Sequence, residues 1–416
     1  GNCSDTFSRP LDADGNHVTW TDKSFVPESF TRDTTRNSWV TGNLFSPTFT
    51  VVTDDGLVSS IDISSQQPAP GAVGMYFANN TLYTVTIDSA KLFGGQPTKT
   101  CNFIMVSSSG SSSVDLSDLS GKPTNFCNDL VVLSNGDSYV TDSTNGLLYK
   151  VAAGKGSVYL SNVDAFKPEP FNNLMLGPNG IEAFVGKGSE QYLLVGVAAR
   201  ASAFTAGKSL FRVNVSTKTV TEVKVAGVEW TGNNGIDGLR FLADGTLGAI
   251  VYVRGVATPL TLKSVDDWAT ATVTGVDRTP AYTSDRGGSY TVLSVKDNAL
   301  WALSTSFAGP GRTTVAKCNF SAPEADWSGN RQVDLDCKCD CCATTPAVTW
   351  IVTATQIKTS FFNMTQCNGG AASAFQVAYV LDKSGPATNQ MSFEIALSGN
   401  YSNRFPNFTI SCTLGA

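Results

Sequence analysis

A repeated β-strand unit is the feature that most restricts how this chain can fold. From Asn128 the sequence reads NDLVVLSNGDSYVTDSTNGLLYKV, in which apolar or alternating strands are separated by Asn-Gly turns. Asn-Gly accepts positive φ at low cost, as two-residue hairpins require. The unit recurs with Asp-Gly as GIDGLRFLADGTLGAIVY from Gly235. Looser copies begin at Pro27, Gly71, Pro178 and Gly287.

The repeats predict a six-bladed β-propeller over about residues 20–320, since they follow one another at intervals of about 50 residues. Each blade is a β-meander that buries its faces only by stacking against its neighbours. Two unrelated β-sandwiches are the alternative, and they would require the same turn chemistry to arise six times. The expected fold class is therefore all-β.

A second module is expected after the propeller. A polar linker leads into the run DLDCKCDCC from Asp334, and β-patterned stretches follow from Ala347, Ala374, Met391 and Asn407. The expected division is a propeller over 1–320, a linker over 321–336 and a Cys-rich all-β module over 337–416. A module of this size usually needs covalent links, so we expect a small, disulfide-rich, β-sandwich-like domain.

The cysteines and N-glycosylation sequons predict an extracellular protein. The cysteine count is even and no histidine lies near them, which favours disulfides in an oxidising compartment over a metal cluster. We expect all ten to be oxidised, and Cys101 and Cys127 are close enough to blades two and three to pair. The first residue, Gly1, agrees with removal of an export signal. The expected disulfide residues are Cys3, Cys101, Cys127, Cys318, Cys337, Cys339, Cys341, Cys342, Cys367 and Cys412. The expected sites of N-linked glycans are Asn2, Asn79, Asn214, Asn319, Asn363, Asn400 and Asn407.

Charge and hydropathy exclude two classes of partner. The net charge is −6 and only 15% of residues are charged, so no basic surface is available to neutralise phosphates. We therefore expect no nucleic acid and no polybasic membrane contact. No apolar run approaches the roughly 18–20 residues of a spanning helix, so we expect no membrane insertion.

The residues that open four of the blades resemble a known family. Pro27-Glu28-Ser29, Asn128-Asp129, Pro178-Asn179-Gly180 and Asp237-Gly238 are similar, in order and spacing, to motifs of the SMP-30/gluconolactonase-like (strictosidine-synthase-like) six-bladed propellers. The resemblance covers about 300 residues and leaves out the Cys-rich tail. It implies a divalent cation at one mouth of the central channel.

The resemblance also implies a role for each motif residue. The cation ligands would be Glu28, Asn179 and Asp237, and Asn128 would contact the substrate. Asp237 would also act as general base in lactone hydrolysis. Carboxylate and amide oxygens are hard ligands that suit Ca²⁺ or Mg²⁺. One departure concerns the substrate, because Phe126 stands where the family's enzymes have an arginine that grips a sugar.

Two hypotheses of function follow. The first is an extracellular structural subunit at the cell surface that assembles with itself into a filament or surface layer, through its termini or its C-terminal β module, with glycans as a further candidate ligand. The second is a metal-dependent lactonase or arylesterase. His17 is the only histidine, so a histidine-based triad or a His-rich zinc site is not expected.

Overall fold

The computed structural model divides the chain into two compact units, Gly1–Gly329 and Asn330–Ala416, and each is considered by itself. In the first unit it describes residues 15–21, 26–54, 58–66, 71–171, 174–198, 209–226, 235–253, 256–277, 289–305 and 312–323. In the second unit it describes the backbone of four strands.

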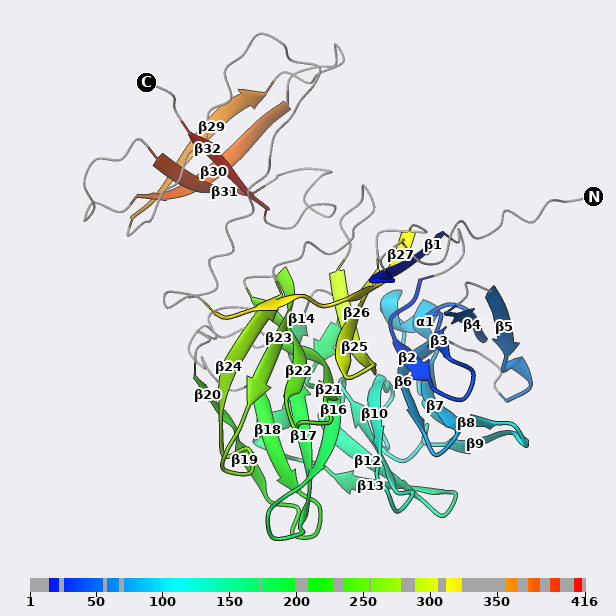
Figure 1. Ribbon diagram of the computed structural model, residues 1–416. Coiled ribbons are helices and arrows are strands. Elements are labelled where there is room, and N and C mark those ends of the chain that lie inside the picture. Colours follow the sequence, from blue (N-terminus) through cyan, green and yellow to red (C-terminus); the bar gives the residue numbers. More distant parts are fainter. Residues whose placement is uncertain are drawn as a thin grey trace, which may run out of the picture. The chain divides into compact units, whose positions relative to one another are not determined.

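Six β-sheets, antiparallel apart from one added strand in blade five, form the blades of the first unit, and each is one of the predicted repeats (Figure 1). Blade one is β2 (Phe30–Asp33), β3 (Ser38–Thr41), β4 (Thr48–Thr53) and β5 (Val58–Asp62). Blade two is β6 (Gly71–Ala78), β7 (Thr81–Ile87), β8 (Asn102–Ser107) and β9 (Gly110–Asp115), with helix α1 (Ser89–Phe93) between β7 and β8. Blade three is β10 (Cys127–Val132), β11 (Ser138–Asp142), β12 (Leu147–Ala152) and β13 (Lys155–Leu160).

The other three blades follow the same plan. Blade four is β16 (Pro178–Val185), β17 (Gln191–Val197), β18 (Leu210–Asn214) and β19 (Val220–Glu222). Blade five is β21 (Ile236–Phe241), β22 (Leu247–Val253), β23 (Val256–Lys263) and β24 (Thr270–Asp277), extended by β20 (Lys224–Ala226) and β28 (Phe320–Ser321). Blade six is β25 (Ser289–Lys296), β26 (Ala299–Thr305), β27 (Arg312–Lys317) and β1 (His17–Thr21). Short elements between blades are the hairpin β14 (Glu169–Phe171) and β15 (Leu174–Leu176) and the 3-10 turns η1 (Ser64–Gln66) and η2 (Asp164–Phe166).

The first strands of the blades form the inner wall of the propeller. β2, β6, β10, β16, β21 and β25 each lie beside the first strand of the next blade, and β25 lies beside β2, so the ring is closed. This arrangement confirms the six-bladed propeller. All six strands run in the same direction along the channel, so their beginnings share one face of the ring, which we call the mouth face. The hairpin turns that follow them share the opposite face.

A strand from the N-terminal part of the chain completes the last blade. β1 pairs with β27 along its whole length, from His17 opposite Ala316 to Thr21 opposite Arg312. Figure 1 shows this contact as blue β1 beside yellow β27. β28, which follows blade six, pairs in turn with β24 of blade five. Segments from both ends of the propeller sequence therefore hold the ring closed.

The turns differ in detail from the expected two-residue hairpins. At Asn135-Gly136 the Leu133 amide donates to the Asp137 carbonyl at 2.8 Å and only Gly136 has positive φ, so the loop has three residues. The Asp-Gly turn of blade five is built in the same way. Two-residue turns with positive φ at both positions occur instead at Asn79-Asn80 and Asp297-Asn298. Asn-Gly therefore predicted the positions of the hairpins correctly, because a three-residue turn also needs one residue with positive φ, and glycine provides it.

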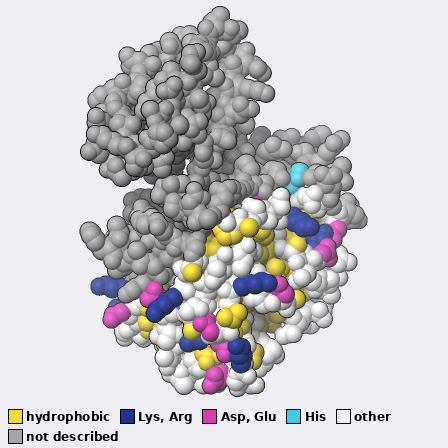
Figure 2. Space-filling view, turned by 60° about the vertical axis from the view of Figure 1, so that its left-hand side comes forward, with side chains coloured by type: hydrophobic (Ala, Val, Ile, Leu, Met, Phe, Trp, Pro, Cys, Tyr) yellow, Lys and Arg dark blue, Asp and Glu magenta, His cyan; other side chains and the backbone are white. Residues whose placement is uncertain are grey.

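Charged side chains on the propeller surface are mixed in sign. Figure 2 shows Lys and Arg side chains beside Asp and Glu on the face in view. Ion pairs between exposed side chains of the propeller include Lys99–Asp118, at 2.9 Å. Among the described residues, no helix has the length and hydropathy needed to cross a membrane.

The second unit contains a four-stranded antiparallel sheet. Its strands are β29 (Gln356–Met364), β30 (Ser373–Leu381), β31 (Gln390–Ala396) and β32 (Phe408–Thr413), in that order across the sheet. The DLDCKCDCC run and the strand expected from Ala347 lie outside the described residues. The four strands agree with an all-β module, and a sandwich-like second layer stays a prediction.

Candidate functional site

One cavity lies on the axis of the propeller at the mouth face. The space inside it is about 10 Å³, enough for about one water molecule or metal ion, and every blade contributes to its wall. The lining residues are Glu28, Ser29, Gly74, Asn128, Asp129, Asn179, Asp237, Gly238, Thr291 and Val292. All four site residues named from the sequence are therefore brought together here.

β-bulges build this cavity. In five blades the pairing between the first and second strands shifts register near the start of the first strand. The shifts lie between Ala72 and Met75, Cys127 and Leu130, Pro178 and Ile181, Ile236 and Leu239, and Tyr290 and Leu293. Each interval contains cavity-lining residues. A bulge breaks strict alternation and redirects side chains, so the irregular pairing turns polar groups toward the axis.

Glycines allow neighbouring bulges to approach one another closely. A Cβ on Gly180 would overlap the Asp237 carbonyl oxygen of the next blade. A Cβ on Gly238 would lie 2.7 Å from the Val292 Cα, and one on Gly74 would lie 2.6 Å from the Asn128 carbonyl oxygen. The Gly after Asn179 and the Gly after Asp237 are thus packing requirements of the site, beyond any role in turns.

Hydroxyl groups on second strands hold the bulges of adjacent blades together. Thr141 Oγ1 donates to the Asn179 carbonyl at 2.7 Å and accepts from the Asp129 amide at 3.0 Å. Ser143 Oγ donates to the Pro178 carbonyl at 2.6 Å. Both hydroxyls belong to blade three and both carbonyls to blade four, so the positions of the two bulges are fixed relative to each other.

The two cavity asparagines have their amide nitrogens engaged by the protein. Asn128 Nδ2 donates to Ser143 Oγ at 3.0 Å. The Asn179 side chain hydrogen-bonds the Asp237 carboxylate, which can only accept. Among the described residues, neither asparagine Oδ1 accepts a hydrogen bond. This orientation leaves two carbonyl oxygens available to a ligand in the cavity.

Three carboxylates share the cavity, and no Lys, Arg or His is among the described residues that line it. Burial raises the pKa of Asp237 to about 7, and the nearby Asp129 charge adds to this rise, while hydrogen bonds from Tyr252 and Asn179 oppose it. Burial raises the Glu28 pKa well above its ordinary value, with further contributions from Asp237 and Asp129. Like charges in a poorly hydrated space disfavour ionisation. The carboxylates therefore require either protons or a cation.

Tyr252 orients the Asp237 carboxylate from the second strand of blade five. Its hydroxyl donates to Asp237 Oδ2 at 3.1 Å. With the Asn179 amide on the same carboxylate, Asp237 is held by contacts from blades four and five. The sequence analysis missed Tyr252 because nothing in its local pattern distinguishes it from other strand aromatics.

A polar cluster fills the channel directly below the cavity. Arg240 Nη2 donates to the Met75 carbonyl at 2.7 Å, which joins blade five to blade two on the opposite side of the ring. The guanidinium lies 4.8 Å from the Tyr76 ring centroid and 3.9 Å from Glu182 Oε2. The Tyr76 hydroxyl donates to Glu182 Oε1 at 3.4 Å.

This channel cluster also affects the cavity. Arg240 lowers the pKa of Asp129, against the stronger effect of burial, which raises it. Asp129 is fixed by the amides of Leu130, at 2.8 Å, and Ile181, at 3.2 Å. The residue that follows Asn128 is therefore part of the site, although the sequence analysis gave it no role.

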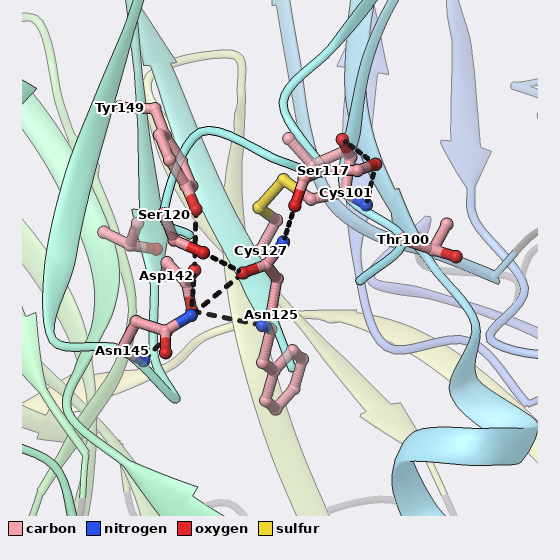
Figure 3. The surroundings of a disulfide bond; sticks show 12 residues. Thr100, Cys101, Ser117, Ser120, Asn125, Cys127, Asp142, Asn145 and Tyr149 are labelled. Atoms are coloured by element: carbon pink, nitrogen blue, oxygen red, sulfur yellow. Dashed lines mark hydrogen bonds between the residues drawn. A yellow bond between two sulfur atoms is a disulfide. The ribbon is translucent and has the colours of Figure 1, made fainter. Parts of the chain in front are cut away.

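The Cys101–Cys127 disulfide links blade two to the first residue of β10, immediately before Asn128 (Figure 3). It confirms the pairing expected from the sequence. Beside it, the buried Asp142 carboxylate accepts hydrogen bonds from the Tyr149 hydroxyl at 2.9 Å and from Asn145 Nδ2 at 2.8 Å. These contacts fix the end of β11, which pairs with Cys127.

Cys318 is buried and has no disulfide partner among the residues whose side chains are described, so its oxidation stays a prediction. The pKa of its thiol is raised by burial and by the nearby Asp277. The two other cysteines whose side chains are described, Cys101 and Cys127, are bonded to each other, so neither is available to it. The remaining seven expected disulfide residues lie where no side chain is described.

Three of the seven sequon asparagines are described with their side chains. Asn79 and Asn319 are exposed, and Asn214 is half-buried. Asn79 lies in the turn after β6 and Asn214 at the end of β18, both on the face opposite the cavity. The other sequons lie outside the residues whose side chains are described.

The donor set of the cavity fits a hard divalent cation. Among the described residues, no group of three or more His, Cys, Asp or Glu side chains has metal-binding spacing. Carboxylates alone therefore do not make the site, and the Asn128 and Asn179 carbonyl oxygens would have to complete it. Mixed carboxylate and amide oxygen sets are typical of Ca²⁺. The expected ligands Glu28, Asn179 and Asp237 all line this cavity, and their role stays a prediction.

Solved structures with the same architecture support the fold. Mala s 1, the major allergen of Malassezia sympodialis, matches 73% of this chain and 96% of its own, with 14% identity and a TM-score of 0.55. A calcium-binding regucalcin from Agrobacterium tumefaciens (14% identity, 72% of this chain, 92% of its own, TM-score 0.45) also matches. So does a putative gluconolactonase (16% identity, 77% and 100%, TM-score 0.46). No protein-family model and no curated protein sequence matches the chain. At these identities the likeness concerns the propeller alone.

Proposed function

We propose that the propeller is a divalent-cation-dependent hydrolase of lactones or esters. The observation that carries the proposal is the axial cavity, whose wall holds three carboxylates and two asparagine side chains, with no basic side chain among its described lining residues. Uncompensated carboxylates in a buried site are costly, so a cation is the natural ligand. Ca²⁺ and Mg²⁺ are favoured over zinc because every available donor is an oxygen.

Each of the cavity residues would have its own role in hydrolysis. Glu28, Asn179 and Asp237 would hold the cation, which when bound polarises a carbonyl and stabilises negative charge that develops on its oxygen. Asp237 would accept a proton from the attacking water, as a general base does. Asn128 accepts a hydrogen bond through Oδ1 and so positions the water or a substrate hydroxyl.

Calcium titration and lactone hydrolysis test this proposal together. We expect Asp237→Asn and Glu28→Gln to weaken Ca²⁺ binding in calorimetry at least tenfold, and to lower kcat/KM by about 10²–10⁴-fold. Glu190→Gln is the matched control, because Glu190 is an exposed carboxylate on the opposite face. Wild-type protein that binds no divalent cation, or an Asp237→Asn variant with full activity, would refute the assignment.

A second proposal concerns where the protein acts. The buried Cys101–Cys127 disulfide favours an oxidising compartment, and the exposed Asn79 and Asn319 sequons are accessible to glycan transfer. We propose that the protein is exported to the cell surface or beyond and carries N-linked glycans. Intact-mass measurement before and after enzymatic deglycosylation tests this, and a mass equal to the bare chain would contradict it.

We also propose self-association through the second unit. Its four strands form an open sheet, and within the described residues the outer edges of β29 and β32 have no partner strand. Open edges of long strands pair readily with another chain. Analytical ultracentrifugation and negative-stain microscopy of the intact glycoprotein test this proposal. A monomer at high concentration would leave the hydrolase as the sole proposed function.

A further inference from the structure

Two exposed phenylalanines lie side by side on the mouth face. Phe45 is 52% exposed and Phe93 is 40% exposed, with their ring centroids 6.3 Å apart. Phe93 in turn packs edge-on against Phe126 at 6.2 Å. We call these three rings the aromatic track. Paired exposed aromatics are uncommon on a monomer surface unless they bind something.

The strand directions place this track on the same face as the cavity. Phe45 lies between β3 and β4, and Phe93 ends the helix that follows β7. β3 and β7 are second strands and run toward the mouth face. Phe126 directly precedes Cys127 and lies two residues before the cavity residue Asn128. The track therefore lies on the mouth face, and its inner residue, Phe126, is close in sequence to the cavity wall.

Backbone hydrogen bonds connect the outer end of the track to the cavity wall. The Leu44 amide donates to the Val26 carbonyl at 2.9 Å, two residues before Glu28. Asn43 Oδ1 accepts from the amides of both Phe45, at 3.0 Å, and Val26, at 3.5 Å. The loop that carries Phe45 is thus fixed to the segment that delivers Glu28.

The floor under the track is apolar. Val26, Leu44, Leu92 and Phe126 are all buried in one hydrophobic cluster that spans blades one to three. Helix α1 is held at its start by Asp88, whose Oδ1 accepts from the Lys91 amide at 3.1 Å. The exposed rings of Phe45 and Phe93 therefore rest on a packed apolar floor, on the same face of the propeller as the polar cavity.

We infer that the substrate is a lactone or ester with an apolar alkyl or aryl arm that lies across Phe93 and Phe45 while its carbonyl group occupies the cavity. This inference rests on the proposed hydrolase function and specifies its substrate class. A polyhydroxylated lactone would lose hydrogen bonds to water on this platform without replacement, which costs binding energy. An alkyl arm gains from every methylene that it buries there.

A matched substrate series tests the inference. The probes are an unsubstituted δ-lactone, the same ring with an octyl chain, and a polyhydroxylated δ-lactone. We expect wild-type kcat/KM to be at least tenfold higher for the octyl lactone than for the polyhydroxylated one. Phe93→Ala and Phe45→Ala should each lower the octyl value about five- to tenfold, mainly through KM, and leave the unsubstituted lactone unchanged.

Controls separate this inference from the proposed function. Val265→Ala removes an exposed apolar side chain from the opposite face and should change nothing. Ca²⁺ affinity should be the same in all the variants, which confirms that they fold. Calorimetry with a non-hydrolysable octyl lactam should show binding that weakens in Phe93→Ala.

The possible outcomes distinguish the inferred substrate class from the proposed hydrolase function. Efficient hydrolysis of the polyhydroxylated lactone, with no effect of Phe93→Ala, would overturn the inference and leave the hydrolase in place. Phe93-dependent lactam binding without any hydrolysis would support the apolar ligand and overturn the hydrolase. If the protein neither binds the lactam nor hydrolyses any of the lactones, the inference and the proposed hydrolase function are both wrong.

Discussion

Removal of the Cys101–Cys127 disulfide should destabilise the propeller by an amount that its loop length sets. The two cysteines are 26 residues apart. Closing a loop of that size in the unfolded chain removes conformational entropy worth about 3.5 kcal/mol at 25 °C. With about 2.1 cal/mol/K of unfolding entropy per residue over roughly 300 residues, this corresponds to a Tm decrease of about 5–6 °C.

The measurement is thermal unfolding of Cys101→Ala/Cys127→Ala, followed by circular dichroism. Cys318→Ala is the control for loss of a buried sulfur, because Cys318 has no disulfide partner among the residues whose side chains are described. The contribution of the cross-link is the Tm decrease of the double variant minus twice the Tm decrease of the control. If this difference is less than 1 °C, loop entropy does not stabilise the fold and the prediction is wrong.

Three further predictions concern the cavity and the channel cluster. Because the pKa of Asp237 is raised to about 7 in the folded protein, the cation-free protein should lose stability as pH rises from about 4 to 7, and Ca²⁺ should remove this slope in a pH series of melts. Gly180→Ala should cost about 1–3 kcal/mol in denaturant unfolding and weaken Ca²⁺ binding, whereas Gly188→Ala, in open surroundings, should do neither. Arg240→Met should raise the ratio of Tb³⁺ affinity to Ca²⁺ affinity, because it removes a positive charge near the cavity, and Glu182→Gln should lower this ratio. Competition luminescence measures the ratio, and an equal change in both variants would contradict an electrostatic role.

Features with a local chemical cause could be predicted from the sequence. Turn residues mark hairpins because positive φ is a property of one or two residues, and six hairpin units suffice to identify the propeller. The Cys101–Cys127 pair followed from assigning each cysteine to its blade. The convergence of Glu28, Asn128, Asn179 and Asp237 followed from equivalent repeat positions, since equivalent positions in a propeller share one face.

Features that depend on packing between blades could not be predicted. A bulge has no dedicated residue type, so the register shifts that redirect Asp129 and Thr291 were invisible in the sequence. Arg240 and Glu182 look like surface charges on alternating strands, yet both are buried in the channel. The turn and strand around His17 could be read from the sequence, but the pairing of β1 with β27 could not, because the two strands are remote in sequence.

The pairing of β1 with β27 also means that the ring can close only late in translation. His17 and Lys317 are separated by 300 residues (317 − 17 = 300), so His17 emerges from the ribosome long before the strand that completes its blade. At about 5–20 residues per second, the interval is roughly 15–60 s. Throughout that time β1 has no partner strand and the ring cannot close. A nascent chain of this kind must therefore keep an unpaired strand from premature association until the sixth blade arrives.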